Sequence, residues 1–278
     1  MLDNLISDIH KVILDPAKKA TPKFIKEFKN DVGKAVEDWF SGREDEAPTL
    51  RMSNIGRPDR LLWFEMNRPV KEANSAQTRL RFLMGHLLEA ALIYLIKEAG
   101  YKVTDQQKEI EIDGVKGHLD AKVNGIPLDA KTASAYAFTK KFSSIEALCE
   151  NDDYGYIPQL SAYMDAEAAP HGYFLGINKN TSEVALLLLD EWNKIDSRKR
   201  IVKVKEIVKQ ESPPKELCYQ PITEDNGNKR LDKRCEWCPY KDNKEFPCFP
   251  GLRAFQYSNE VRYYAEVVKK PRVEEISL

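Results

Sequence analysis

The chain has 278 residues, of which 42% are hydrophobic and 10% aromatic, enough to bury a sizeable core and to exclude general disorder. Its 43 Lys and Arg residues balance 44 Asp and Glu residues, and the net charge of −1 argues against a protein that coats nucleic acid unselectively. Five cysteines are too few for a secreted fold stapled by disulfides. Cys149 stands apart from the other four and is expected to be a small buried apolar residue.

The N-terminal sequence lacks the basic start and unbroken apolar run of a secretory signal peptide. No stretch approaches the roughly 18 apolar residues that a membrane span needs. We therefore expect a cytoplasmic protein, in a bacterial cell or a phage-infected host cell, with no membrane partner.

Residues 1–46 form a separate zone in which apolar residues recur at helical spacing. Pro16 and Pro22 divide this zone into two amphipathic helices, and the polar tract 41–48 is a plausible linker. We therefore expect an N-terminal helical appendage over 1–46 and a main domain over 47–278. The appendage could pack on the main domain, carry a partner or cover a site.

The main domain alternates helices and strands, which predicts an α/β fold. Asp113-Gly114 and Asn124-Gly125 are strong hairpin turns and divide three strands of a meander. A helix precedes the meander, and a helix, two strands and two further helices follow it. In chain order these elements are expected at 75–99, 108–113, 115–123, 126–132, 153–168, 172–177, 183–190, 191–211 and near 251–269.

Carboxylates and one lysine should converge at the meander. Asp129 and Lys131 alternate along one strand and share a face, as do His118 and Asp120 on the strand before. The Asn-Gly turn brings Asp120 close to Asp129, and Glu89 of the upstream helix could supply a third carboxylate. A lone Asp-x-Lys is usually a surface ion pair. In strands that are otherwise apolar, an unpartnered carboxylate is costly, so a bound Mg²⁺ or Mn²⁺ is an attractive explanation.

Four short motifs follow one another in a fixed order: Gly85-x-x-x-Glu89, Gly117-His-Leu-Asp120, Asp129-Ala-Lys131 and Gln159-x-x-x-Tyr163. Together they resemble the PD-(D/E)XK nuclease superfamily, in its RecB-type and phage-exonuclease branch, over about residues 50–250. The resemblance implies a restriction-endonuclease-like core of a helix, a three-strand meander, a helix and further strands, with a C-terminal cysteine knuckle at 218–250.

The resemblance also implies roles for single residues. Glu89, Asp120, Asp129 and the carbonyl of Ala130 would bind the metal ion, and Lys131 would be the catalytic lysine. Many relatives carry a histidine where this chain has Glu89, a departure that would change metal preference more than activity.

Two further pairs would contact substrate. The resemblance implies that Gln159 and Tyr163, one helical turn apart, face the site and help to place the DNA strand. Ser53 and Arg60 match the opening segment of the family and would contact a phosphate. The alternatives are a helix cap for Ser53 and a solvated charge for Arg60.

The clustered cysteines also resemble a known motif. Cys235, Cys238 and Cys248 resemble the knuckle of RecB-type nucleases with iron–sulfur clusters, including the CRISPR spacer-acquisition nucleases. Those proteins take a fourth cysteine from the opening segment, where this chain has Pro58; Cys218 could substitute. Four thiolates would suit a [4Fe–4S] cluster or Zn²⁺, and a relict knuckle without metal is the third alternative.

The leading hypothesis is a Mg²⁺- or Mn²⁺-dependent deoxyribonuclease, an exonuclease rather than an endonuclease, acting in DNA replication, repair or recombination. The alternatives are a CRISPR spacer-acquisition type of nuclease, or a non-catalytic DNA-binding or assembly module on a nuclease fold. No base-reading motif is present, so DNA recognition should be largely independent of sequence. The basic segment Lys194–Lys205 could follow phosphates or be a solvated helix face. A homo-oligomer or a replication or recombination partner protein is left open.

Overall fold

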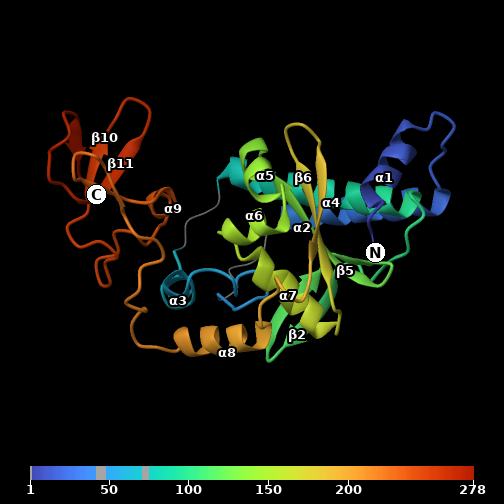
Figure 1. Ribbon diagram of the computed structural model, residues 1–278, viewed down its shortest axis with the longest axis horizontal. Coiled ribbons are helices and arrows are strands. Elements are labelled where there is room, and N and C mark those ends of the chain that lie inside the picture. The colour runs from blue at the N-terminus through green and yellow to red at the C-terminus, as the bar shows by residue number, and fades with distance from the viewer. Residues whose placement is uncertain (1, 42–47, 71–74) are drawn as a thin grey trace. The chain divides into compact units, whose positions relative to one another are not determined.

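The computed structural model describes residues 2–41, 48–70 and 75–278 (Figure 1). Its contacts divide the chain into two units. Unit 1 comprises Met1–Gly56 and Glu72–Val202, and unit 2 comprises Arg57–Lys71 and Lys203–Leu278. This division does not follow the boundary expected near residue 46. Residues 42–47 of the expected linker lie outside the described residues.

Unit 1 is built on a mixed five-stranded sheet. Its strand order is β1-β4-β5-β6-β7, with only β5 and β6 parallel among these neighbours. The turn between β4 and β5 is Asn124-Gly125, and both residues have positive φ, as a tight hairpin requires. The mixed α/β class is therefore confirmed. The strands are β1 (Val103–Thr104), β4 (Ala121–Val123), β5 (Ile126–Ala133), β6 (Gly172–Asn178) and β7 (Val184–Leu189).

The second strand of the predicted meander is interrupted at Asp120. β2 (Lys108–Ile112) and β3 (Val115–Leu119) form a separate antiparallel hairpin, whereas β4 joins the five-stranded sheet. The Asp120 carboxylate, at the junction, accepts a hydrogen bond from the backbone N–H of Ala130 on β5. A continuous strand over 115–123 is therefore wrong, because the chain changes sheets where this side chain turns toward β5.

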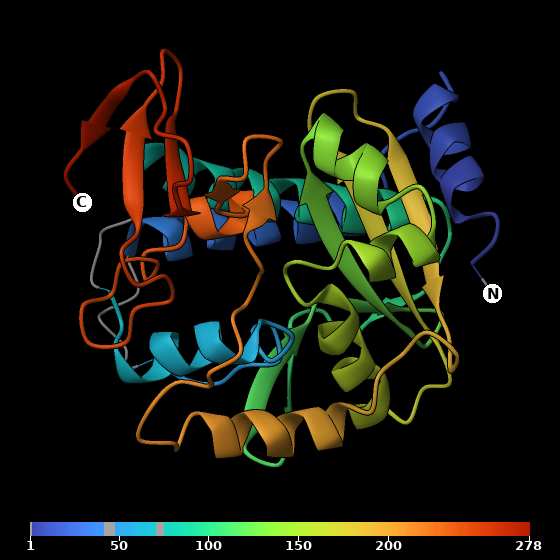
Figure 2. The same cartoon turned by 60° about the vertical axis from the view of Figure 1, so that its left-hand side comes forward.

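Helices cover both faces of the sheet, as Figures 1 and 2 show. Leu128 of β5 packs with α4 and α1 on one face, whereas Lys131 of the same strand contacts Gln159 of α7 on the other. None of the described helices is both long and apolar enough to cross a membrane. The helices of unit 1 are α1 (Leu5–Leu14), α2 (Pro22–Ser41), α4 (Ala76–Glu98), α5 (Ala135–Lys141), α6 (Ile145–Glu150) and α7 (Tyr156–Ala166).

The N-terminal helices belong to the core of unit 1. Leu2, Leu5 and Ile9 are buried in one cluster with residues of α4, β4, β5 and β6. α2 packs along α4, where the indole N–H of Trp39 donates to the backbone carbonyl of Arg79 over 2.9 Å. Of the roles left open for the appendage, packing on the main domain is the one that the structure shows for α1.

Unit 2 contains α3 (Asp59–Asn67), most of the region after Lys203 and a second five-stranded sheet, ordered β12-β10-β11-β9-β8. The predicted helix near 251–269 is wrong, because this region forms the antiparallel pair β10 and β11. Phe255 and Tyr264 are buried there, and aromatic residues favour strands. The elements are α8 (Ser197–Ile207), which begins in unit 1, β8 (Ile222–Thr223), β9 (Lys229–Arg230), α9 (Lys233–Glu236), β10 (Arg253–Gln256), β11 (Val261–Glu266) and β12 (Glu274–Ile276).

The burial of α1 predicts a large stability effect from one leucine. Leu5→Ala removes a side chain with no exposed surface and should lower the free energy of unfolding by about 2–5 kcal/mol in urea titration. Leu14→Ala, on the same helix but 78% exposed, is the control and should change it by less than about 0.5 kcal/mol. Equal effects of the two substitutions would contradict the integration of α1 into the core.

Candidate functional site

An ion pair between Asp129 and Lys131 lies at the centre of the sheet in unit 1. The Asp129 side chain has no exposed surface, and its Oδ2 lies 2.6 Å from the Lys131 ammonium. Neither Asp129 oxygen accepts a hydrogen bond of ordinary geometry from the described residues. Burial raises the pKa of Asp129, and the ammonium opposes that rise. The Lys131 ammonium thus compensates most of the negative charge of a carboxylate that water does not reach.

Asp120 lies next to this pair. The pairing of Ala121 with Leu128 places Asp120 beside Asp129 across the β4–β5 hairpin. Its Oδ2 accepts a hydrogen bond of 2.7 Å from the backbone N–H of Ala130. Burial raises the pKa of Asp120 well above its ordinary value, and the neighbouring carboxylates of Glu89 and Asp129 raise it further.

Glu89 on α4 is the third carboxylate. Burial, followed by repulsion from Asp129, raises its pKa to about 7. Gln107 donates a hydrogen bond of 2.7 Å to Glu89 Oε1 from the loop between β1 and β2. Asp105 and Gln107 of this loop both have positive φ, at 54° and 52°, which is unusual for residues other than glycine. The loop therefore has a strained conformation, which brings the side-chain amide of Gln107 into hydrogen-bond contact with Glu89.

The Lys131 ammonium is held from several directions. It donates to Gln159 Oε1 over 3.2 Å, and Gln159 in turn donates to the Tyr163 hydroxyl over 2.9 Å. It also lies 4.9 Å from the centre of the Tyr156 ring. Burial lowers the pKa of Lys131, but Asp129 and Asp120 outweigh burial and raise it above its ordinary value. Lys131 therefore stays charged at neutral pH.

The chemistry of this group fits a divalent cation. Repulsion among three carboxylates contributes to this fit, because Asp129 raises the pKa of Glu89, and Glu89 and Asp129 together raise the pKa of Asp120. Among the described residues, the Lys131 ammonium is the group that contacts the buried Asp129 carboxylate, and neither Asp129 oxygen accepts a hydrogen bond of ordinary geometry. In the part of the chain that the structure describes, however, no three His, Cys, Asp or Glu side chains are already arranged to hold a metal ion. The ammonium of Lys131 lies against Asp129 instead.

Three residues of this site were not predicted from the sequence. Gln107 and Tyr156 contact Glu89 and Lys131, and no sequence pattern marks either of them. Asp152 accepts hydrogen bonds from the backbone N–H groups of Tyr156 and Ile157. An aspartate just before a helix is a recognisable capping signal, so this residue could have been found from the sequence.

Ser53 and Arg60, the two matching residues of the opening segment, belong to different units. Ser53 is exposed in a turn of unit 1 and caps no helix. Arg60 is buried in unit 2, where its guanidinium donates to Cys248 Sγ over 3.1 Å and to the carbonyls of Pro214 and Phe246 over 2.6 and 3.1 Å. The phosphate contact expected of Arg60 is therefore corrected: its donors are used within unit 2.

The four clustered cysteines line one cavity of about 40 Å³ in unit 2. All are free thiols. Burial raises the pKa of Cys218 to about 11 and of Cys235 to about 12, with neighbouring cysteines adding to both shifts. The expectation that Cys149 is buried is wrong, since it is exposed on α6. The cavity is lined by Cys218, Cys235, Cys238 and Cys248 with Leu61, Leu217, Tyr219, Arg234, Lys241 and Phe249.

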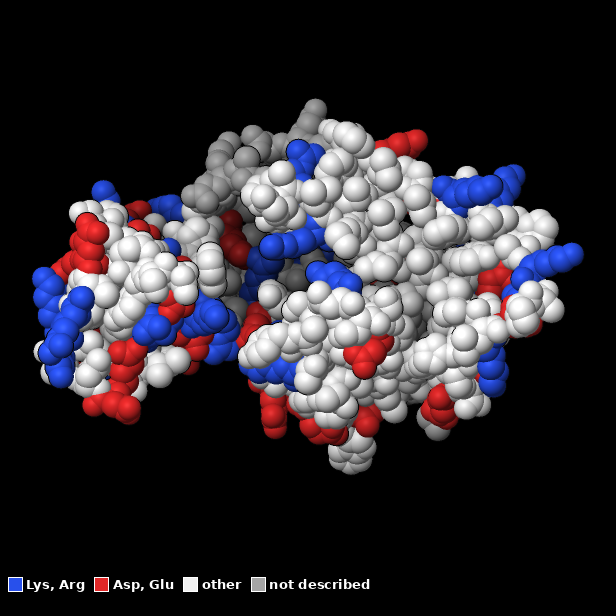
Figure 3. Space-filling view, turned by 90° about the horizontal axis from the view of Figure 1, so that it is seen from above, with Lys and Arg blue, Asp and Glu red and all other residues white. Residues whose placement is uncertain are grey.

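The basic residues that could have followed phosphates are largely paired with acids. In the segment Lys194–Lys205, Lys203 pairs with Asp59 over 2.8 Å. Lys141 of α5 is buried and pairs with Asp153 over 3.3 Å. On the face drawn in Figure 3, Lys and Arg side chains are interspersed with Asp and Glu. Further pairs are Lys194–Asp165, Arg198–Asp113, Lys199–Asp196, Lys229–Glu266, Arg230–Glu236 and Arg234–Asp232.

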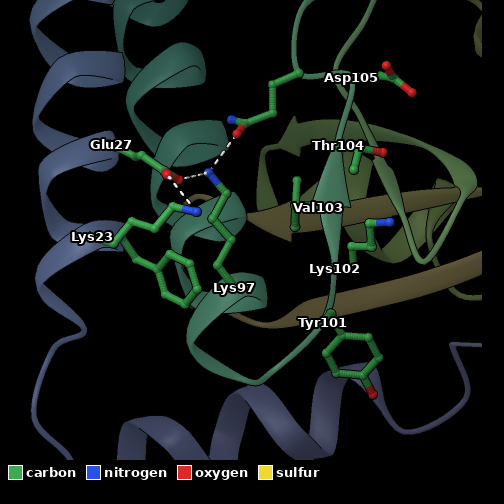
Figure 4. Close-up of a pocket in the computed structure, with 10 residues that line it drawn as sticks. Lys23, Glu27, Lys97, Tyr101, Lys102, Val103, Thr104 and Asp105 are labelled. Carbon is green, nitrogen blue, oxygen red and sulfur yellow. Dashed lines mark hydrogen bonds and ion pairs between the residues drawn. The ribbon is translucent and has the colours of Figure 1, made fainter.

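A larger pocket, of about 470 Å³, lies elsewhere in unit 1 (Figure 4). It is formed by α2, the end of α4 and β1, and none of the three carboxylates or Lys131 lines it. Its buried cation, Lys97, is bound by Glu27 Oε2 over 2.7 Å and by Gln106 Oε1 over 2.6 Å. Because the Lys97 charge is already compensated, this pocket is a weaker candidate for a catalytic site than the cluster of Glu89, Asp120 and Asp129.

Comparison with known proteins gives structural neighbours only. No family model and no curated protein matches the sequence. One similar solved structure is the protein SSO0001, with 18% identity and a TM-score of 0.41, covering 77% of this chain and 93% of that one. Another is a phage-related exonuclease from Haemophilus somnus 129PT, with 12% identity and a TM-score of 0.41, covering 59% of this chain and 91% of that one.

The raised pKa of Glu89 predicts that its charge destabilises the metal-free protein. A carboxyl whose pKa is raised by folding contributes stability below its unfolded value of 4.5, and that stability is lost as pH rises through about 7. In EDTA, Glu89→Gln should therefore raise the free energy of unfolding at pH 8 by on the order of 2 kcal/mol, and this gain should vanish below about pH 4.5.

Glu109→Gln is the matched control, because Lys116 lowers the pKa of this exposed carboxyl. It should give no stabilisation at pH 8. Urea titrations across this pH range measure both variants, and identical pH profiles for Glu89→Gln and the unsubstituted protein would contradict the raised pKa of Glu89.

Proposed function

We propose that the chain is a metal-dependent deoxyribonuclease with a PD-(D/E)XK core. The convergence of Glu89, Asp120 and Asp129 on one lysine that is only 16% exposed is the observation that carries this proposal. The order of elements around them, α4, the β2–β5 region, α7 and β6, follows the arrangement that the sequence motifs imply. A surface ion pair would need no such burial.

The carboxylates of Glu89, Asp120 and Asp129, with the carbonyl of Ala130, would hold Mg²⁺ or Mn²⁺. When bound, such an ion polarises a phosphoryl oxygen and lowers the pKa of a water molecule. The backbone N–H of Ala130 already fixes one oxygen of Asp120, so the carboxylate has a defined orientation before any ligand binds. Gln107 fixes one oxygen of Glu89 in the same way.

Lys131 would stabilise charge rather than remove a proton. Its raised pKa keeps the ammonium protonated at neutral pH, which excludes it as a general base in this state. Gln159 and Tyr156 hold the ammonium from the α7 side. From there it would bind an oxygen of the scissile phosphate and stabilise the negative charge that develops during hydrolysis. Gln159 and Tyr163 would then position Lys131, as a hydrogen-bonded chain behind it.

We further propose that the enzyme is an exonuclease acting on DNA in replication, repair or recombination, with little sequence preference. A non-catalytic DNA-binding module would not require three mutually repelling carboxylates around a lysine, so the geometry favours catalysis over that alternative.

Cleavage assays test this proposal. Asp129→Asn and Lys131→Met should each reduce Mg²⁺- or Mn²⁺-dependent cleavage of end-labelled linear DNA by about 100-fold or more. The first removes a charged ligand of the proposed metal ion, and the second removes the cation that would stabilise charge on the reacting phosphate. Lys116→Met, a lysine that is 56% exposed on β3, is the control and should keep full activity. Circular dichroism verifies that the variants fold.

Full activity of both site variants would show that the assigned site is wrong, and cleavage of closed circular DNA would contradict an enzyme that acts only at ends. Binding of Mn²⁺, followed by electron paramagnetic resonance, provides a readout independent of turnover. It should weaken in Asp129→Asn.

For unit 2, we propose that Cys218, Cys235, Cys238 and Cys248 bind one metal centre, a [4Fe–4S] cluster or Zn²⁺. Their thiols line a single small cavity, and neighbouring cysteines add to the raised pKa of Cys218 and of Cys235, as closely spaced thiols do. Cys218 would take the place of the cysteine that the opening segment lacks. Metal binding would displace the thiol protons and fix the loops of unit 2.

Metal analysis of anaerobically purified protein tests the cysteine site. An iron–sulfur cluster should give iron, sulfide and a broad visible absorption band, and zinc should give a stoichiometric metal without colour. Cys218→Ser and Cys235→Ser should each lose the bound metal, whereas Cys149→Ser, the exposed cysteine of α6, should retain it. A metal-free, colourless protein would support the relict alternative.

A further inference from the structure

We infer that Tyr154 forms a stacking subsite for one unpaired nucleobase beside Lys131, so that the strand that is cut carries unpaired nucleotides at the site. This inference rests on the proposed nuclease function and deepens it by naming the class of substrate.

Tyr154 is connected to Lys131 by a short series of ring and cation contacts. The Lys131 ammonium lies 4.9 Å from the centre of the Tyr156 ring, and the Tyr156 and Tyr154 rings are stacked, with centres 5.6 Å apart and planes 28° apart. Tyr154 is 58% exposed, whereas Tyr156 is half-buried. The contacts thus lead from the partly buried Lys131, the proposed catalytic lysine, to an aromatic ring at the surface.

Much of Tyr154 stays exposed beside its two neighbours. The Lys141 ammonium lies 4.4 Å from the centre of the Tyr154 ring and 5.9 Å from that of Tyr156. With Lys141 and Tyr156 both in contact with its ring, Tyr154 still keeps 58% of its surface exposed, which leaves room for a further aromatic group.

The loop that carries Tyr154 is held in place before any ligand binds. Asp152 accepts hydrogen bonds of 2.7 and 2.8 Å from the backbone N–H groups of Tyr156 and Ile157. Gly155 has a φ of +79°, and a methyl group on it would overlap with the backbone of Gly56. The ion pair of Lys141 with Asp153 fixes the other side of the loop. Such an ordered loop loses little conformational entropy when a ligand stacks on it.

An aromatic face next to a phosphate-binding lysine suits a nucleobase. Stacking on tyrosine does not depend on the identity of the base, because every base presents a flat π surface. A base within a duplex has both faces covered by its neighbours, whereas an unpaired base has a free face. Tyr154 would therefore select single-stranded nucleotides without selecting sequence.

Equilibrium binding of full-length protein in EDTA tests the inference without turnover. The probes are a single-stranded oligonucleotide of about 12 nucleotides that carries 2-aminopurine, and a blunt duplex of the same length. Tyr154→Ala should raise the Kd for the single strand about 5- to 100-fold and reduce the quenching of 2-aminopurine. Tyr154→Phe, which keeps the ring, should stay within about 2-fold of the unsubstituted protein. Trp192→Ala removes a ring that is 92% exposed beyond β7 and should change nothing.

Unchanged single-strand affinity in Tyr154→Ala, equal losses in Tyr154→Ala and Tyr154→Phe, or absence of single-strand binding by the unsubstituted protein would each overturn the inference. An equal loss for the blunt duplex would also overturn it. The two proposals fail separately: a protein that binds as expected but does not cleave with Mg²⁺ or Mn²⁺ would refute the nuclease, and cleavage without the Tyr154 effect would refute the stacking subsite.

Discussion

The burial of Asp129 is the constraint on which the rest of unit 1 depends. A carboxylate without exposed surface at the centre of a sheet must be neutralised, and the Lys131 ammonium 2.6 Å away is its partner. Stability does not explain the pair, because two apolar residues of similar volume would suit the sheet at least as well. Removing either partner alone would leave an uncompensated charge. A pair of this kind is therefore best explained by chemistry that needs both groups.

The surrounding residues do not complete the neutralisation. Glu89, Asp120 and Asp129 carry three potential negative charges against the one positive charge of Lys131. The donors that reach the carboxylates are a backbone N–H on Asp120 and the amide of Gln107 on Glu89. The pKa of Glu89 consequently rises to about 7, so the group takes up a proton when nothing else compensates it. A divalent cation would supply the two missing positive charges. Its binding would relieve the repulsion among the carboxylates, and this relief would favour the metal-bound state.

The sequence predicts local features of this site better than its framework. The Asn124-Gly125 turn and the alternation along β5 are enough to place Asp120, Asp129 and Lys131 together, because both follow from backbone geometry within a dozen residues. The break at Asp120 was not predictable, since it depends on a hydrogen bond to another strand. The grouping of residues 57–71 with the region after Lys203 was not predictable either, because contacts between residues so far apart in the sequence leave no periodic pattern. Arg60 shows the consequence: its motif matched, but its donors are used by carbonyls in unit 2.

For the proposed nuclease, the pairing of surface charges limits one source of affinity for DNA. Lys203, Lys229 and Arg234 each have an acidic partner, so attraction for phosphates at long range is weaker than the sequence suggests. Counterion release scales with the number of phosphates that free cations neutralise, and paired cations contribute little to it. Affinity would then come from contacts at short range near Lys131, where charge is buried and screening by salt is weak. Such a nuclease would select its substrate by the conformation of the DNA strand end that reaches the site. Contacts with a long stretch of duplex would contribute less.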